Sequence, residues 1–395
     1  MMPLLSSQER KNMLEYKYSG GDSSPVYQYI LSPFAQVLVD NMIPMWMAPN
    51  VVTLIGLCAS VLSMIVTLLW NPQLNENGPH WLHLLNALCV FAYQTFDNMD
   101  GKQARRTGTS SPLGMLFDHG CDALNAGIIC IPMASVAATG WTTKFYMCLW
   151  SGFLPFYFQA WEEYYTGSMV LPPFNGPTEG LLIAIGMCCL SYIFGAHYWH
   201  QSVFQLSPEW SVLGIPIVDG ACDITPYFMA FSFTTTVSSI IALKQIYTVI
   251  VHVLRSGNSQ QSVGKALLDL LPFLVFFPTI LYWCAVSDIA LSWYPLVTML
   301  LISCTFVEML VHIMIAHICA TEMKPLERYG AYLAVMLPLA VNSSHEYAEI
   351  SILFALAAFQ TLLMVIILYR VCTEMADELG IYIFIQGKRQ KRKGL

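Results

Sequence analysis

Residues 97–122 read DNMDGKQARRTGTSSPLGMLFDHGCD and place four aspartates where two strongly apolar segments meet. Asp97 and Asp100 are three residues apart, and Asp118 and Asp122 are four apart, so on helices each pair shares one face. Carboxylates inside apolar segments are unfavourable unless they are paired or functional. Four of them repel one another at neutral pH unless cations lie between them. The stretch therefore predicts two facing helices that hold a cation site.

The residue types in this stretch favour a hard divalent cation and a phosphate-containing ligand. Carboxylate oxygens at this density suit Mg²⁺, Mn²⁺ or Ca²⁺ rather than zinc. Arg105 follows the first acidic pair and adds the positive charge that an anionic phosphate needs. Gly114 lies one turn before Asp118 on the same face, and it leaves room for a helix or a ligand to approach closely.

The fixed positions follow the pattern D-x2-D-G-x2-A-R-x8-G-x3-D-x3-D. This pattern resembles the signature of the CDP-alcohol phosphotransferase family. The flanking stretches 100–107, 111–114, 116–120 and 176–180 are similar to those of its eukaryotic choline/ethanolamine phosphotransferase group. Met115 departs from that group, whose members usually carry Glu at this position. The resemblance covers nearly the whole chain.

The resemblance implies an activity and its ligands. It implies two divalent ions, Mg²⁺ or Mn²⁺, that bridge the diphosphate of CDP-choline or CDP-ethanolamine. Diacylglycerol is the implied acceptor, and the products are phosphatidylcholine or phosphatidylethanolamine and CMP. The implied metal ligands are Asp97, Asp100, Asp118 and Asp122. The residues expected to contact the nucleotide or its phosphates are Asn50, Thr53, Gly101, Lys102, Ala104, Arg105 and Gly114.

Two residues are candidates for the base that accepts the alcohol proton. Asp122 is one, because the last aspartate of the family signature is commonly given this role. His119 is the other, since it lies beside Asp118 and an imidazole titrates near neutral pH. A histidine next to acids can also be no more than their hydrogen-bond partner. We favour His119 and keep Asp122 as the alternative.

Composition indicates a membrane protein. The chain has 395 residues, of which 56% are hydrophobic and only 11% are charged. That balance is typical of an all-α polytopic membrane protein and excludes an ordinary soluble domain. The twelve cysteines include no Cys-x-x-Cys pair, so we expect reduced thiols and no zinc site. No nucleic-acid polymer is expected as a partner.

Hydropathy predicts about ten transmembrane helices after an N-terminal amphipathic helix over residues 26–40. That first helix either lies on the membrane surface or packs on the protein itself. The predicted spans are 50–70, 81–98, 113–138, 145–164, 178–200, 226–250, 266–286, 291–318, 329–341 and 349–371.

Loop charges predict the orientation. Lys and Arg gather at the N-terminus and in alternate loops, so both termini and loop 99–112 are expected in the cytosol. The expected location is the endoplasmic reticulum membrane, with the Golgi as an alternative, and with the active site facing the cytosol. The sequon at Asn342 then lies on the lumenal side, too close to the membrane to be used.

The chain divides into four expected parts. Residues 1–49 form a cytosolic segment, 50–200 the catalytic helices, 201–371 the helices of the lipid route and of a homodimer contact, and 372–395 a basic tail. The run Lys388–Lys393 favours binding to anionic headgroups, while its Lys-x-Lys-x-x ending also resembles an endoplasmic-reticulum retrieval signal.

Two further clusters have open interpretations. The aromatics of residues 161–165 are typical of an interfacial belt, and a contact with a quaternary ammonium is the alternative. Glu308 and His312, one turn apart, form an internal pair or line the lipid route or a subunit contact.

Two other functions remain as alternatives. One is a sibling transferase with another head group or acceptor, such as inositol. The other is an ion-coupled transporter, which predicts midplane sites and internal repeats that the sequence does not display. The choice between choline and ethanolamine, the acyl-chain preference and the physiological metal stay open.

Overall fold

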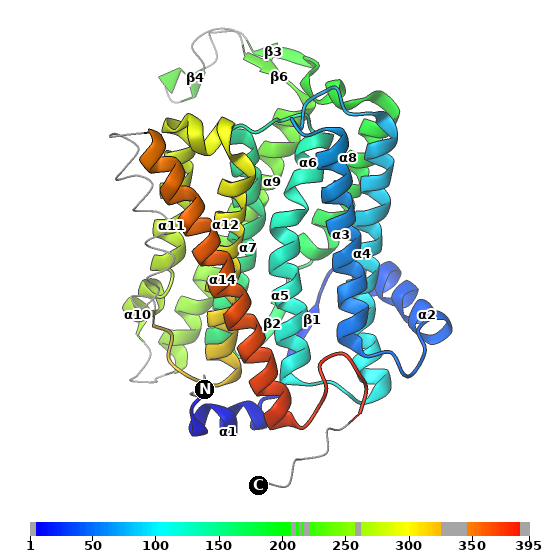
Figure 1. The fold of residues 1–395 in the computed structure, drawn as a ribbon, viewed down its shortest axis with the longest axis vertical. Coiled ribbons are helices and arrows are strands. Elements are labelled where there is room, and N and C mark those ends of the chain that lie inside the picture. Colours follow the sequence, from blue (N-terminus) through cyan, green and yellow to red (C-terminus); the bar gives the residue numbers. More distant parts are fainter. Residues whose placement is uncertain are drawn as a thin grey trace.

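The protein is a bundle of long helices, seen in a computed structural model that describes residues 5–206, 211–212, 215–216, 222–256, 262–324 and 346–387 (Figure 1). The helices are α1 (Ser7–Glu15), η1 (Tyr27–Leu31), α2 (Ser32–Met42), α3 (Pro49–Trp70), α4 (His80–Thr107), α5 (Pro112–Ile128), α6 (Cys130–Val136), α7 (Thr143–Thr166), η2 (Gly176–Gly180), α8 (Leu181–Phe194), η3 (Ala196–His200), α9 (Pro226–Ser256), α10 (Val263–Leu268), α11 (Leu271–Val286), η4 (Ile289–Trp293), α12 (Pro295–Ile318) and α14 (Glu346–Leu379).

Strands are few and short. They are β1 (Gly20–Asp22), β2 (Met169–Leu171), β3 (Phe204–Leu206), β4 (Ser211–Val212), β5 (Ile215–Pro216) and β6 (Cys222–Ile224). β1 pairs with β2 in parallel, and this ties the N-terminal segment to the end of α7. β3 pairs with β6, and β4 with β5, both antiparallel.

The helices confirm an all-α polytopic membrane protein. Six helices of the described residues are long and apolar enough to cross a membrane. They are α3, η2–α8, α9, α10–α11, α12 and α14. Helices also cover three other predicted spans, as α4, α5–α6 and α7. The predicted span 329–341 lies outside the described residues, as do Asn342 and the tail Lys388–Lys393. The count of ten therefore stays a prediction.

Local sequence signals shape the hairpin between α4 and α5. Gly108 ends α4 in the left-handed conformation, with φ of 65°, which glycine adopts without strain. Ser111 caps α5 by accepting a hydrogen bond from the Gly114 amide at 3.1 Å, and Pro112 follows at the first helical position. The short connection brings the two acid-bearing helix ends together.

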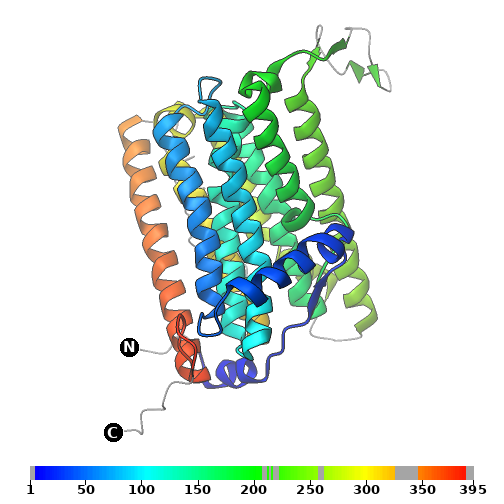
Figure 2. The same cartoon turned by 90° about the vertical axis from the view of Figure 1, so that its right-hand side faces the viewer.

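The N-terminal amphipathic helix is present as η1 and α2. Ala35 and Val39 are buried against Val52 and Met99, so one face packs on α3 and α4. The opposite face leaves Ile30, Phe34 and Val37 exposed. Figure 2 shows α2 lying across the outside of the bundle. Both interpretations of this helix are therefore compatible with its position, because it has a packed face and an exposed apolar face.

The aromatics that end α7 are packing residues, and the expectation of an interfacial belt is wrong. Trp161 is fully buried and donates to the Ala266 carbonyl at 3.1 Å. The Tyr164 hydroxyl donates to the Thr321 carbonyl at 2.9 Å, and Tyr165 donates to Asp269 at 2.5 Å. Their hydroxyl and ring N–H groups tie α7 to α10, to Asp269 at the end of α10, and to the turn after α12.

Glu308 and His312 form an internal pair between α12 and α14. A Glu308 carboxylate oxygen lies 3.5 Å from His312 Nδ1, and the other accepts a hydrogen bond from the Gln360 amide at 3.0 Å. Of the interpretations that the sequence left open, the structure supports a hydrogen-bonded interior pair.

Candidate active site

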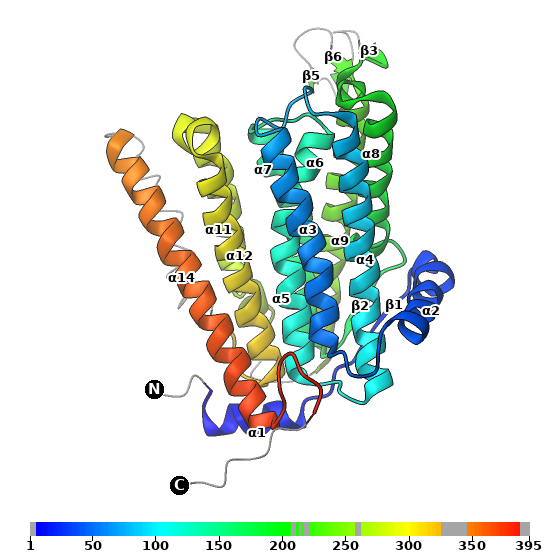
Figure 3. The ribbon, with the colours of Figure 1, turned by 45° about the vertical axis from the view of Figure 1, so that its right-hand side comes forward.

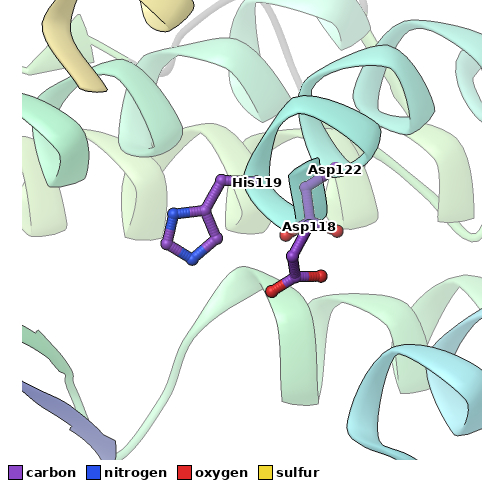
Figure 4. Close-up of side chains that lie close together, drawn as sticks. All are labelled: Asp118, His119 and Asp122. Atoms are coloured by element: carbon purple, nitrogen blue, oxygen red, sulfur yellow. The ribbon is translucent and has the colours of Figure 1, made fainter. Parts of the chain in front are cut away.

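The structure brings the four predicted aspartates together at one end of the bundle. The carboxyl groups of Asp97 and Asp122 lie close enough to interact with each other, and so do those of Asp100 and Asp118. Each pair thus joins α4 to α5. Asp118, His119 and Asp122 each offer a ligand atom within 4.8 Å of the others, and Figure 4 shows the two carboxylates side by side with the imidazole to one side.

The donor set fits a divalent cation. Asp118 Oδ1 is buried without a hydrogen-bond partner. Across the described ranges, no Lys, Arg or His forms an ion pair with any of the four carboxylates. Facing carboxylates with no cationic side chain between them are hard oxygen donors in an unfavourable arrangement. A bound Mg²⁺ or Mn²⁺ would remove the repulsion.

Two hydroxyl groups orient these carboxylates. Thr53 Oγ1 donates to Asp100 Oδ2 at 2.5 Å, and the Tyr93 hydroxyl donates to Asp122 Oδ1. Thr53 was expected at the nucleotide, and the structure adds a contact with Asp100. Tyr93 was missed by sequence reasoning, although it lies one turn before Asp97 on the same helical stripe.

The expected nucleotide residues fall into two groups. The first lies near the acidic cluster. A methyl group on Gly101 would lie 3.6 Å from a guanidinium nitrogen of Arg105, so these two residues and Ala104 share a surface of α4. A methyl group on Gly114 would lie 3.8 Å from Asn50 Oδ1, which places Asn50 beside α5.

The second group is Lys102, which turns away from the cluster together with its neighbour Arg106. Lys102 Nζ donates to Ser32 Oγ at 2.7 Å, at the start of α2. Arg106 donates to the carbonyls of Val39 and Ile43 at 2.6 and 2.8 Å, at the end of α2. These two cations hold α2 against α4, and the structure does not bring them to the acidic cluster.

A second buried group, which sequence reasoning missed, lies within electrostatic range of His119. Within the described part of the chain, His119 forms no hydrogen bond. His317 lies close enough to His119 for their charges to interact. His317 Nε2 lies 3.6 Å from Glu163 Oε1 and 3.3 Å from the Tyr16 hydroxyl. No local spacing relates these residues, because they come from α5, α7, α12 and the N-terminal segment.

Comparison with known proteins places this geometry in a family context. A family model described as CDP-alcohol phosphatidyltransferase matches residues 46–207, which include all of the predicted site residues. Choline/ethanolaminephosphotransferase 1 of Arabidopsis thaliana is 34% identical over 380 residues, covering 93% of this chain and 95% of the relative. Cholinephosphotransferase 1 of Saccharomyces cerevisiae is 34% identical over 285 residues, covering 68% of each chain. Choline/ethanolaminephosphotransferase 1 of the same yeast is 33% identical and covers 71% of this chain and 72% of the relative.

Proposed function

Because this chain belongs to the CDP-alcohol phosphatidyltransferase family, we propose that it transfers phosphocholine, phosphoethanolamine or both from the CDP-linked alcohol to diacylglycerol. The products are phosphatidylcholine or phosphatidylethanolamine and CMP. The observation that carries the proposal is the pairing of Asp97 with Asp122 and of Asp100 with Asp118 across the α4–α5 hairpin. Such a cluster suits a substrate that arrives with divalent cations.

The four aspartates would hold two Mg²⁺ or Mn²⁺ ions. When bound, these ions supply positive charge that stabilises the diphosphate and the departing CMP oxygens. The chain's own contribution is to orient the carboxylates. Thr53 and Tyr93 do this by donating hydrogen bonds to Asp100 and Asp122.

The donor would lie against the exposed surface of α4 at this end. Gly101 and Ala104 leave space there, and Arg105 is exposed beside them, so its guanidinium can bind phosphate oxygens. Asn50 and Gly114 would border the nucleotide from α3 and α5. Lys102 is the weakest member of the expected set, because it is engaged with Ser32.

The acceptor hydroxyl of diacylglycerol attacks the phosphorus that carries the amino alcohol, and the phosphorus–oxygen bond to CMP breaks. The proton of that hydroxyl must go to a base. Asp122 is already engaged by Tyr93 and by the Asp97 carboxyl, whereas His119 forms no hydrogen bond in the described chain. This difference supports His119 as the base and leaves Asp122 as a metal ligand.

A direct assay tests the proposal. Purified protein in lipid nanodiscs is incubated with diacylglycerol, Mg²⁺ or Mn²⁺, and either CDP-choline or CDP-ethanolamine, and the lipid products are identified by mass spectrometry. We expect phosphatidylcholine, phosphatidylethanolamine or both, with one CMP per lipid. A product formed only from a different CDP-linked donor or acceptor would indicate the sibling transferase. Ion-coupled uptake into proteoliposomes without any product would indicate a transporter.

The wider arrangement is also proposed. The enzyme would reside in the endoplasmic reticulum membrane, with the Golgi as the alternative, and would form a homodimer through residues 201–371. Residues 50–200 would form the catalytic unit, between the N-terminal segment 1–49 and the tail 372–395. The alternation of basic and non-basic loops supports an active site that faces the cytosol.

Cysteine labelling tests that orientation. Ser110 lies in the loop after α4, and Asn77 lies in the loop between α3 and α4; both are exposed. In sealed microsomes, an impermeant maleimide should label a Ser110→Cys variant and spare an Asn77→Cys variant, with both in a background without reactive cysteines. Labelling of Asn77→Cys alone would indicate the opposite orientation of the protein in the membrane. Labelling of both would contradict the assignment of α4 as a membrane span.

A further inference from the structure

A C-terminal segment lies over the helix ends that border the site. Gly380, with φ of 65°, ends α14 and turns the chain, and residues 381–387 then return to the starts of α3 and α5 (Figure 3). The segment is held there by three contacts with α3, α5 and the turn before α3. Asn50 Nδ2 donates to the Ile383 carbonyl at 2.9 Å. Gln386 Nε2 donates to the Met47 carbonyl at 2.9 Å, and the rings of Phe384 and Phe117 meet edge to face at 5.6 Å.

These contacts fix the Asn50 side chain. Its amide nitrogen is occupied by the Ile383 carbonyl, and its oxygen is turned toward Gly114. Asn50 is also largely buried, so its amide has little freedom to rotate. Phe117, on which Phe384 packs, directly precedes Asp118 in α5. The segment therefore touches the expected nucleotide border on α3 and the acid-bearing helix α5 at once.

We propose that residues 381–387 are a positioning segment of the nucleotide site. They hold the Asn50 amide with its oxygen facing the α3–α5 border, and they raise affinity for the CDP-linked donor without touching the reacting atoms. A side chain that is already oriented loses less conformational entropy when the ligand binds. The inference rests on the proposed function for the identity of the donor.

The test releases the segment without shortening it. A Phe384→Ala and Gln386→Ala double variant removes the ring contact and the hydrogen bond to Met47, and both side chains are peripheral. Losing one hydrogen bond and one aromatic contact should raise the KM for the CDP-linked donor and the Kd for CMP about fivefold or more. The kcat at saturating donor and the KM for diacylglycerol should stay within about twofold of the wild-type values.

A matched control lies within the same segment. Ile385 is 65% exposed, so Ile385→Ala changes a neighbouring apolar side chain and should leave the KM for the donor unchanged. A second pair of variants guards against local misfolding. A chain ending after Gly380 should repeat the rise in KM, and a chain ending after Gly387 should behave as wild type.

A double-mutant cycle shows whether the segment acts through Asn50. Asn50→Ala should itself raise the KM for the donor, and in that background the Phe384/Gln386 changes should add little, because both act on one amide. Full additivity would overturn the inference, and so would an unchanged KM and CMP affinity in the double variant. CMP binding needs no turnover. If the wild-type protein binds CMP but transfers nothing from either CDP-amino alcohol, the proposed function fails while the comparison of CMP affinities still tests the segment.

Discussion

Replacing any one of Asp97, Asp100, Asp118 or Asp122 by Ala is expected to lower turnover by at least about a thousandfold, and excess EDTA should do the same to the unchanged protein. Each carboxylate faces another across the α4–α5 hairpin. Under the two-metal proposal, removing one takes away a ligand of an ion that would neutralise the diphosphate of the donor. The measurement is CMP release at saturating donor and acceptor.

The control for this series is Asp288→Ala. Asp288 is an exposed aspartate in the connection between α11 and α12, and Figure 1 shows that connection at the opposite end of the bundle from the turn between α4 and α5. It should keep wild-type activity. All variants should still insert into the membrane, and Mn²⁺ binding, followed by electron paramagnetic resonance, should fall only in the cluster variants. Near-wild-type turnover in two cluster variants, or full activity in EDTA, would contradict the two-metal proposal.

The acidic hairpin could be predicted because its information is local. The spacings of three and four residues place each aspartate pair on one helical face, and Gly108 and Ser111 mark the turn between the helices. The apolar segments likewise locate nine of the ten predicted spans as helices of the described chain. Hydropathy alone does not identify α4, α5 and α7 as membrane spans, because these helices carry the polar residues of the site and are not among the six that are long and apolar enough to cross a membrane.

Contacts between distant parts of the chain could not be predicted from spacing. The Glu163–His317 pair joins residues more than a hundred positions apart, and Asn50 meets Ile383 across 333 positions. Helical geometry could have separated Lys102 from the cluster. It lies two residues after Asp100, about 200° around the helix, so it faces α2 rather than α5. Lys102 is also not one of the fixed positions of the family signature, which likewise indicates that it lies away from the cluster.

The second large effect is expected from the replacement of His119, the proposed base. His119→Ala should lower kcat by at least about a hundredfold while the affinity for the CDP-linked donor changes little, because general-base assistance is typically worth about 10²- to 10⁴-fold. His119 lies beside the aspartates that we propose bind metal, and it has no hydrogen-bond partner in the described chain, so its ring is available to the acceptor hydroxyl.

Asp122→Ala provides the contrast, since it should lose metal and donor binding together with turnover. The control is His197→Ala, which changes an exposed histidine in η3 and should leave donor binding and turnover intact. The experiment compares kcat with the Kd for the donor, measured in the absence of diacylglycerol. Loss of donor affinity in His119→Ala would make His119 part of the metal site. If His119→Ala retains most of its kcat, the proton goes to another acceptor, and Asp122 is then the better candidate. The Asp122 carboxylate interacts with both Tyr93 and Asp97, so these side chains offer a route by which the proton can leave.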